Sequence, residues 1–221
     1  MIEVKNIHKY YDELHVLKGV DLKINKKEII SIVGASGTGK TTLLQILGTL
    51  DTFSKTDQES SLIINGKDIS SLNRNQLAKF RNENLGFIFQ FHQLLPEFTA
   101  LENVCIPAFI KKTPKEVAEK RAKELLSFLN LSDRENHKPN ELSGGEQQRV
   151  AVARSLINNP AIILADEPSG NLDTESAESL HNLFFKLRDE FGQTFVIVTH
   201  NNELANMADR KLVMKDGKIV L

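Results

Sequence analysis

The sequence predicts an α/β fold built around a largely parallel sheet, and three observations lead to it. First, short apolar runs rich in β-branched residues recur along the chain, at 28–33, 62–64, 85–89, 161–165, 194–199 and 211–214. Second, several of these runs are almost continuously apolar, as expected of strands buried on both faces. Third, stretches with helical patterns lie between the runs, and such an alternation favours parallel strands joined by helices.

Length and composition narrow the class of protein. A chain of 221 residues is long enough to bury a full core as one large domain or two small ones. The net charge of -1 gives no general attraction to nucleic acid. The single cysteine, Cys105, excludes an internal disulfide, and a small buried hydrophobe is a simpler interpretation of it than a reactive thiol.

Neither a membrane span nor a signal peptide is expected. No segment approaches the roughly 18 consecutive apolar residues that a span needs. The N-terminus, M-I-E-V-K-N-I, lacks the apolar stretch of a signal peptide. We therefore expect a cytoplasmic chain, with other subunits supplying the membrane if it serves a membrane process.

A glycine-rich loop follows the first of the buried runs and precedes the apolar stretch 43–50. Its sequence, G-A-S-G-T-G-K-T-T, matches the phosphate-loop pattern G-x-x-x-x-G-K-[ST], and strand, loop and helix follow in the expected order. The backbone N–H groups should surround phosphates, Lys40 should reach the β- and γ-phosphates, and the Thr41 hydroxyl should bind Mg²⁺. The predicted nucleotide-binding residues are Gly34, Ala35, Ser36, Gly37, Thr38, Gly39, Lys40, Thr41 and Thr42.

The middle third of the chain differs from the rest. No strong strand pattern appears between 90 and 157, whereas apolar residues recur at near-helical spacing over 114–131, and a further helix is expected from Ser143 to about Ile157. We interpret this third as a helical subdomain, 90–157, inserted into an α/β core formed by 1–89 and 158–221. The polar stretch 52–61 is the best candidate for a mobile surface loop.

A second anion-binding site is predicted at L-S-G-G-E-Q-Q, residues 142–148. Ser143 and Glu146 fit a capping box, so a helix should begin at Ser143. With Gly144 and Gly145 beside it, the helix N-terminus presents backbone N–H groups and the positive end of its dipole to a phosphate. Two separated anion sites for one nucleotide suggest a site closed by two copies of the chain, in an ATP-driven dimerising motor.

Polar residues follow three of the predicted strands. Asp166 and Glu167 come after 161–165, where Asp166 suits a Mg²⁺ contact and Glu167 could polarise the attacking water. His200 could hydrogen-bond the γ-phosphate, and Gln90 could contact Mg²⁺ through its amide oxygen. We interpret the apolar segment after Gln90, 91–98, as a docking surface for a partner, with Gln90 sensing the nucleotide. The alternatives are a solvated loop end for the acidic pair, a structural or surface role for the histidine, and core packing for Gln90 and the segment after it. The other histidines, at 8, 15, 92, 137 and 181, form no metal-ligand spacing.

Taken together and in this order, these motifs resemble the ATP-binding cassette ATPases over essentially the whole chain. The resemblance implies a RecA-like P-loop NTPase core with a mostly parallel sheet, an N-terminal antiparallel β part and the inserted helical subdomain. It implies that Tyr11 stacks on adenine and that Asp173, in S-G-N-L-D, crosses a dimer interface. It also implies a head-to-tail, ATP-dependent homodimer in which Ser143 and Gly145 of one copy contact ATP held by Lys40 of the other, with ATP and Mg²⁺ as cofactors.

The segment 87–104, F-I-F-Q-F-H-Q-L-L-P-E-F-T-A-L-E-N-V, is similar to the lipoprotein-releasing branch of that family. This closer resemblance implies ATP hydrolysis that drives release of lipoproteins from the inner membrane toward the outer membrane. It implies integral membrane permease subunits of the LolC/LolE-like kind, a peripheral location on the cytoplasmic side of the inner membrane, and no nucleic-acid partner. The ATPase of a macrolide or peptide exporter, or of a cell-division complex, is the alternative.

The chain departs from the family pattern at three places. Threonines at 38, 41 and 42 replace some of the usual serines, which preserves the hydroxyl chemistry. Asn201 follows His200 where aspartate is common. The segment between Asp51 and Asn65 is a few residues longer than usual and lacks a Pro/Gly turn.

Overall fold

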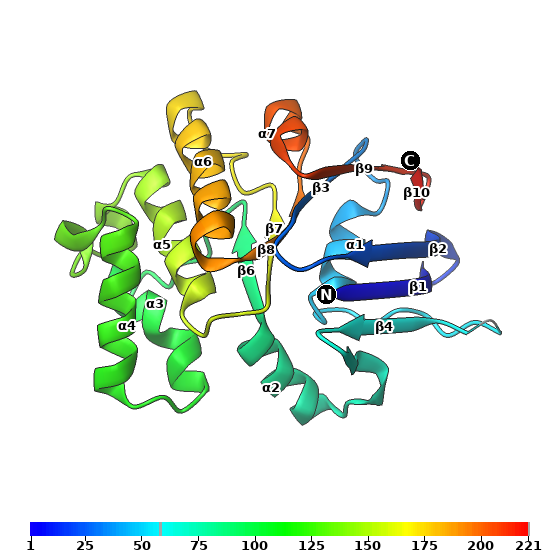
Figure 1. Ribbon diagram of the computed structural model, residues 1–221, viewed down its shortest axis with the longest axis horizontal. Coiled ribbons are helices and arrows are strands. Elements are labelled where there is room, and N and C mark those ends of the chain that lie inside the picture. Colours follow the sequence, from blue (N-terminus) through cyan, green and yellow to red (C-terminus); the bar gives the residue numbers. More distant parts are fainter. Residues whose placement is uncertain (58, 221) are drawn as a thin grey trace. The chain divides into compact units, whose positions relative to one another are not determined.

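The computed structural model describes residues 1–57 and 59–220 (Figure 1). The chain folds as two compact units, one formed by Met1–Ala78 with Phe185–Leu221 and the other by Lys79–Phe184. The helices α2 (Arg74–Asn84) and α6 (Thr174–Phe191) each run from one unit into the other. The first unit is therefore built from both ends of the sequence.

The first unit contains an antiparallel sheet, as the predicted N-terminal β part requires. Its strand order is β2-β1-β4-β5, and the strands are β1 (Ile2–Tyr11), β2 (Leu14–Ile24), β4 (Ser61–Ile64) and β5 (Lys67–Asp68). Along β1 the buried residues Ile2, Val4 and Ile7 face the core, near the period of two that a half-buried strand requires.

The second group of strands in this unit carries the phosphate loop. Its order is β10-β9-β3-β8, with β3 (Ile29–Val33), β8 (Thr194–Val198), β9 (Arg210–Lys215) and β10 (Lys218–Val220). β3 pairs in parallel with both β8 and β9, whereas β9 and β10 form an antiparallel hairpin. All residues of β8 are buried, which explains its continuous apolar sequence. The unit also holds α1 (Lys40–Leu47), the short helix η1 (Ile69–Ser71) and α7 (Asn202–Met207).

The second unit combines two parallel strands with a group of helices. The strands are β6 (Leu85–Phe89) and β7 (Ile162–Asp166), and the helices are α3 (Ala100–Ile110), α4 (Lys115–Phe128) and α5 (Gly144–Leu156), with short turns at η2 (Ser132–Arg134) and η3 (Pro139–Glu141). α3 packs against both α4 and α5. The core face of α4 carries Ala118, Ala122, Leu125 and Leu126, as the sequence pattern predicted, but Val117 is exposed.

The structure agrees closely with the predicted elements. Each predicted strand is found within about one residue at either end, and no strand lies between 90 and 157, all of which the structure describes. Ser143 caps α5 as the capping box predicted. In the predicted loop 52–61, Ser54 forms an isolated bridge with His8 and Ser61 begins β4. Residue 58 lies outside the described residues. The division into a core and a subdomain at 90–157 stays a prediction.

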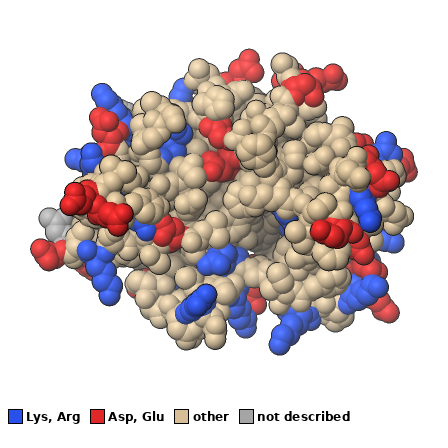
Figure 2. All heavy atoms as spheres, turned by 180° about the vertical axis from the view of Figure 1, so that it is seen from behind, with Lys and Arg blue, Asp and Glu red and all other residues tan. Residues whose placement is uncertain are grey.

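Two further properties bear on partners. In the described part of the chain, no helix combines the length and apolar character that crossing a membrane requires. On the face shown in Figure 2, side chains of both signs are scattered over the surface. This distribution fits the near-zero net charge.

Candidate functional site

The phosphate loop connects β3 to α1 in the first unit. Gly39 caps α1 with φ 99°, a left-handed backbone conformation that favours glycine, and a Cβ there would meet the side chains of Leu17 and Met214. No side chain caps the helix and its first turn has no acidic residue. Because the first N–H groups of a helix lack partners within it, this N-terminus is a suitable site for an anion.

Lys40 lies folded against its own loop. Its Nζ donates to the carbonyl oxygens of Gly34 and Ala35, at 2.8 and 2.9 Å. The Thr38 hydroxyl donates to the Ala35 carbonyl at 2.9 Å, which closes the loop into a compact curl. The exposed residues Ala35, Ser36 and Gly37 form its outer rim. A glycine-rich curl of this kind, with Lys40 at its end, is suited to phosphate binding through its backbone N–H groups.

His200 emerges at the same edge of the sheet as the phosphate loop. β3 and β8 are parallel neighbours with Ile32 opposite Val198, and the Thr199 amide donates to the Ile32 carbonyl at 3.2 Å. Since carboxyl ends of neighbouring parallel strands meet at one edge, His200 and the loop after Val33 share that edge. The departure at Asn201 has a local explanation, because its Oδ1 accepts from the Leu204 amide at 2.9 Å and caps α7 as aspartate would.

Tyr11 lies at the end of β1 and is partly exposed, at 44%. Its hydroxyl donates to Asp51 Oδ2 at 2.7 Å, and Lys9 Nζ lies over the ring, 4.7 Å from its centroid. The hydrogen bond to Asp51 raises the pKa of Tyr11, with burial adding to the effect. Burial acts to raise the pKa of Asp51, but hydrogen bonds from Lys9, Tyr11 and the Thr52 amide outweigh it and the pKa lies below its usual value. The neighbouring Tyr10 instead stacks on His15, with ring centroids 3.9 Å apart.

In the second unit, the predicted acidic pair and Gln90 meet at one edge. β6 and β7 are parallel with Phe89 opposite Asp166, so Gln90 and Glu167 follow at the same end of the two strands. Glu167 has φ 45°, which is uncommon for a residue with a side chain and often found where function fixes the backbone. The structure thus brings together the three residues of this unit that the sequence placed near Mg²⁺ and the attacking water.

The segment after Glu167 is held by polar contacts that the sequence did not reveal. Gln90 Nε2 donates to Asn171 Oδ1 at 3.1 Å, and Asn171 Nδ2 donates to the Gln90 carbonyl at 3.1 Å. His181 Nε2 and the Ser169 hydroxyl, both buried, lie 3.0 Å apart. His181 therefore has a structural place beside this segment, although its position in the sequence suggested none.

Asp173 caps the next helix, α6. Its carboxylate accepts from the Ser176 amide at 2.9 Å and from the Ser176 hydroxyl at 2.8 Å. These hydrogen bonds, the backbone one foremost, lower the pKa of Asp173. Asp173 is exposed, and its hydrogen bonds to Ser176 hold its carboxylate in place at the surface.

The second anion site has the geometry that the capping box predicted. Ser143 Oγ accepts from the Glu146 amide at 3.3 Å, and Glu146 Oε2 accepts from the Ser143 amide at 2.8 Å. Glu146 also binds Arg134 Nε at 2.9 Å, and its pKa is lowered, first by the Ser143 amide. Ser143 and Gly144 are exposed. Because the Ser143 hydroxyl accepts in this contact, its own proton can be donated to a ligand.

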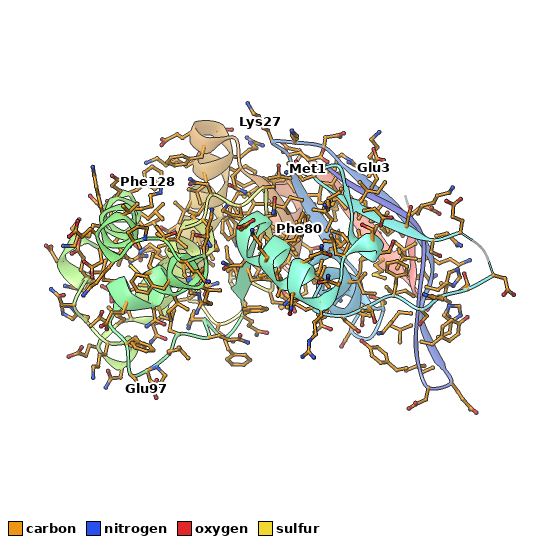
Figure 3. All side chains as sticks on the ribbon, turned by 90° about the horizontal axis from the view of Figure 1, so that it is seen from below. Met1, Glu3, Lys27, Phe80, Glu97 and Phe128 are labelled. Carbon is orange, nitrogen blue, oxygen red and sulfur yellow. The ribbon has the colours of Figure 1, made fainter. Side chains whose placement is uncertain are left out.

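Apolar side chains are exposed on the segment that follows Gln90. The exposed fractions of Phe91, Leu95 and Phe98 are 72%, 44% and 40%. Figure 3 shows Glu97, from the same segment, projecting outward. Large apolar side chains gathered on one loop are typical of an interaction surface. We call residues 91–98 the docking loop.

Two polar residues, the buried Asn103 and the partly buried Arg154, hold the docking loop in shape. Asn103 on α3 is fully buried, donates to the carbonyls of Leu95, Phe98 and Thr99 at 3.0–3.1 Å, and accepts from the Leu95 amide at 2.8 Å. Arg154 on α5 donates to the carbonyls of Gln93 and His92, at 2.6 and 2.8 Å. The loop that exposes the apolar side chains is therefore fixed by the interior of its unit.

The donor set suits ATP with Mg²⁺ better than a metal held by protein alone. Within residues 1–57 and 59–220, no three histidine, cysteine or carboxylate side chains are grouped to hold a metal ion. Mg²⁺ usually takes only one or two protein oxygens and completes its shell with phosphates and water. Such oxygens are carried by Thr41 in the first unit and by Asp166 and Gln90 in the second.

Comparison with known proteins decides the family. Residues 17–170 match the family model described as ABC transporter. The chain belongs to the ABC transporter family. A solved dimeric structure of MJ0796, a bacterial ABC transporter cassette, superposes with a TM-score of 0.89 at 42% identity, covering 100% of this chain and 97% of that chain. A post-hydrolysis dimer of the same cassette with ADP and Pi has the same TM-score at 41% identity.

Relatives within the ABC transporter family are similar over the whole chain. The lipoprotein-releasing system ATP-binding protein LolD of Bacteroides thetaiotaomicron is 61% identical over 219 residues, 99% of each chain. LolD of Porphyromonas gingivalis is 61% identical over 217 residues, 98% of this chain and 97% of that protein. LolD of Aquifex aeolicus is 47% identical, and 100% of this chain is aligned. The resemblance expected from 87–104 is thus confirmed.

Proposed function

We propose that this chain is the ATP-hydrolysing subunit of an ABC transporter that releases lipoproteins from the inner membrane toward the outer membrane. The observation that carries the proposal is 61% identity to LolD over 99% of both chains. The exposed docking loop, which lies in the segment that first suggested this branch, supports it. The chain would lie on the cytoplasmic face of the inner membrane as a peripheral subunit.

ATP would be held first by the phosphate loop. Lys40 would exchange its hydrogen bonds to the Gly34 and Ala35 carbonyls for the β- and γ-phosphates, while the N–H groups of 37–41 surround the β-phosphate. Tyr11 would stack on adenine through the ring face away from Lys9. Thr41 and Gln90, with Asp166 acting through water, would hold Mg²⁺, which would supply charge neutralisation at the phosphates.

Glu167 would accept a proton from the water that attacks the γ-phosphate, and His200 would donate a hydrogen bond to that phosphate. Glu167 follows the buried strand β7 and His200 follows the buried strand β8, so the pairing of these strands fixes the backbone at both residues. A general base that is anchored in this way loses little freedom on reaching its working position.

The site would be completed by a second copy of the chain. The exposed N-terminus of α5 offers the Ser143 hydroxyl and the N–H groups of Gly144 and Gly145, with Glu146 closing the cap behind them. In a head-to-tail dimer these donors would reach ATP held by Lys40 of the other copy, and Asp173 would lie at the interface. The dimeric MJ0796 cassette, similar over the whole chain, supports this arrangement.

The membrane partners would be LolC/LolE-like permease subunits that cover the docking loop. Phe91 and Leu95 offer apolar area, while Asn103 and Arg154 keep the loop in one conformation. A preformed apolar surface binds with less loss of conformational entropy than a loop that must order first.

Affinity capture from native membranes tests the proposal. The bait is the full chain carrying Glu167→Gln with ATP and Mg²⁺, and bound proteins are identified by mass spectrometry. We expect a pair of integral membrane proteins with lipoproteins attached, and a strong loss of both with Phe91→Ser in the bait. A matched control is Phe191→Ser, since Phe191 is also exposed, at 49%, but lies far along the chain from the docking loop. Capture of an unrelated exporter or division protein would contradict lipoprotein release.

A further inference from the structure

A hydrogen-bond network surrounds Asp51, a residue to which the proposed mechanism gives no role. Its Oδ2 accepts from the Tyr11 hydroxyl at 2.7 Å, and its Oδ1 accepts from Lys9 Nζ at 2.7 Å and from the Thr52 amide at 2.7 Å. All members belong to the first compact unit. The carboxylate thus joins a residue of β1 to the segment that follows α1.

Lys9 is the second connection. It is buried, with its side chain 10% exposed, and its Nζ also donates to the Thr52 carbonyl at 2.8 Å. The same ammonium lies over the Tyr11 ring. A cation held at one face of an aromatic ring is attracted to it, so Lys9 fixes the ring from one side and leaves the opposite face for a ligand.

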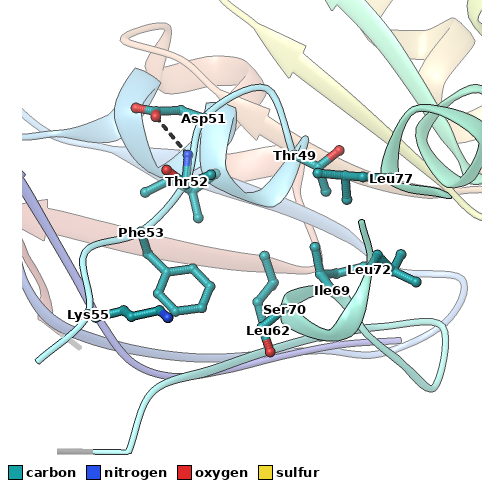
Figure 4. Close-up of a pocket in the computed structure, with 11 residues that line it drawn as sticks. Thr49, Asp51, Thr52, Phe53, Lys55, Leu62, Ile69, Ser70, Leu72 and Leu77 are labelled. Carbon is teal, nitrogen blue, oxygen red and sulfur yellow. Dashed lines mark hydrogen bonds between the residues drawn. The ribbon is translucent and has the colours of Figure 1, made fainter. Parts of the chain in front are cut away.

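Asp51 is itself tied to the phosphate-loop helix. The amides of Leu50 and Asp51 donate to the Gln45 carbonyl, at 2.9 and 3.3 Å, which closes the end of α1. Figure 4 shows Asp51 and the bond from the Thr52 amide at the wall of a cavity of about 230 Å³, whose other lining includes Phe53 and Leu62. The helix α1, which begins at Lys40, is therefore linked through the Gln45 carbonyl to Asp51, the residue that holds the Tyr11 hydroxyl.

We infer that Asp51 is a positioning residue, which holds the Tyr11 ring at a fixed place relative to the phosphate loop so that one nucleotide can engage both. The inference rests on the proposed stacking of Tyr11 on adenine. Without the anchor, a ring that is partly exposed samples other rotamers. The apparent affinity for ATP then becomes proportional to the fraction of time that the ring still spends in place.

The experiment measures binding of ATP and of inorganic tripolyphosphate to the full chain by calorimetry. Tripolyphosphate has no base, so it reports the phosphate loop alone. Tyr11→Phe keeps the ring and removes the hydroxyl, and Asp51→Asn removes the charge. Tyr11→Ala removes the aromatic ring that would stack on adenine. Tyr10→Phe is the matched control, because Tyr10 stacks on His15 and takes no part in the network.

We expect Tyr11→Phe and Asp51→Asn each to weaken ATP binding about fivefold, as for a ring in place about one-fifth of the time. We expect Tyr11→Ala to weaken it about tenfold or more. Tripolyphosphate binding should not change in any of them, and Tyr10→Phe should match the unaltered chain. The double variant Tyr11→Phe/Asp51→Asn should weaken ATP binding by less than the product of the two single effects, since both changes act on the Tyr11–Asp51 contact.

Three results would overturn the inference. If Tyr11→Ala weakens ATP binding but Tyr11→Phe and Asp51→Asn do not, the ring stacks on adenine but Asp51 does not position it, and the inference is refuted. If Asp51→Asn weakens ATP and tripolyphosphate equally, Asp51 acts on the phosphate loop rather than on the ring. If Tyr11→Ala leaves ATP binding unchanged, the proposed stacking itself fails. Should Asp51→Asn not fold, Tyr11→Phe, which leaves the carboxylate in place, decides alone.

Discussion

Replacing Asn103 with alanine should destabilise the chain strongly, because this buried amide bonds to the docking loop and to Thr99 beside it. Its Nδ2 has two protons, which are shared among the carbonyls of Leu95, Phe98 and Thr99, and its Oδ1 accepts from the Leu95 amide. Two donated protons and one accepted bond, at about 1 kcal/mol net each, give a loss of about 3 kcal/mol. The loop is partly exposed and water will replace some of these partners, so we expect a loss of about 2–3 kcal/mol in the free energy of unfolding.

The assay is urea unfolding followed by circular dichroism, together with amide hydrogen exchange at Leu95, whose N–H is held by Asn103. Exchange at Leu95 should accelerate markedly in the variant. Asn140→Ala is the matched control, since Asn140 is an exposed asparagine of the same unit and its replacement should change stability by no more than about 0.5 kcal/mol. A loss below about 1 kcal/mol for Asn103→Ala, with unchanged exchange at Leu95, would refute the role assigned to this side chain.

Three further predictions follow from the site and the core. Glu167→Gln should trap an ATP-bound dimer with little turnover, seen by light scattering in ATP and Mg²⁺; near-normal turnover would remove its role as base. Ser143→Ala should abolish hydrolysis and leave ATP binding by the single chain intact, while the lost cap costs about 1 kcal/mol; unchanged hydrolysis would argue against a shared site. Burial, with smaller contributions from two glutamates, raises the pKa of Cys105 from 9.0 to about 11. Iodoacetamide at pH 8 should therefore alkylate the native thiol about 100-fold more slowly than the urea-unfolded one. Since the folded pKa is the higher one, the thiol's contribution to stability is present below pH 9 and lost as pH rises toward 11. Equal alkylation rates would contradict the burial of Cys105.

The parts of the fold that the sequence predicted are those with local signals. Buried parallel strands such as β8 are apolar throughout, and the capping box of α5 lies within four residues of chain. The helices α2 and α3 were not predicted. α2 has no buried residue, so its sequence shows no apolar periodicity. α3 begins with a capping box at Thr99 and Glu102, a local signal that was overlooked, and it is apolar on most of its surface and contains Pro107. The predicted burial of Cys105 is confirmed.

The contacts that shape the site could not be predicted, because their partners are distant in sequence. Asp51 meets Lys9 across 42 positions, and Arg154 meets His92 across 62. A single aspartate or arginine in a sequence does not reveal which backbone groups it will reach. Asn171 is a partial exception, since it lies within S-G-N-L-D, yet its pairing with Gln90 depends on the register of β6 and β7.

ATP-driven release of a lipoprotein is the measurement that tests the central proposal most directly. The chain and the membrane subunits captured with it are reconstituted in proteoliposomes that contain a lipid-anchored lipoprotein, and the protein leaving the membrane is quantified after ATP is added. We expect release with the unaltered chain, none with Glu167→Gln, and a strong reduction with Phe91→Ser. ATP hydrolysis at a normal rate without release of the lipoprotein would contradict it.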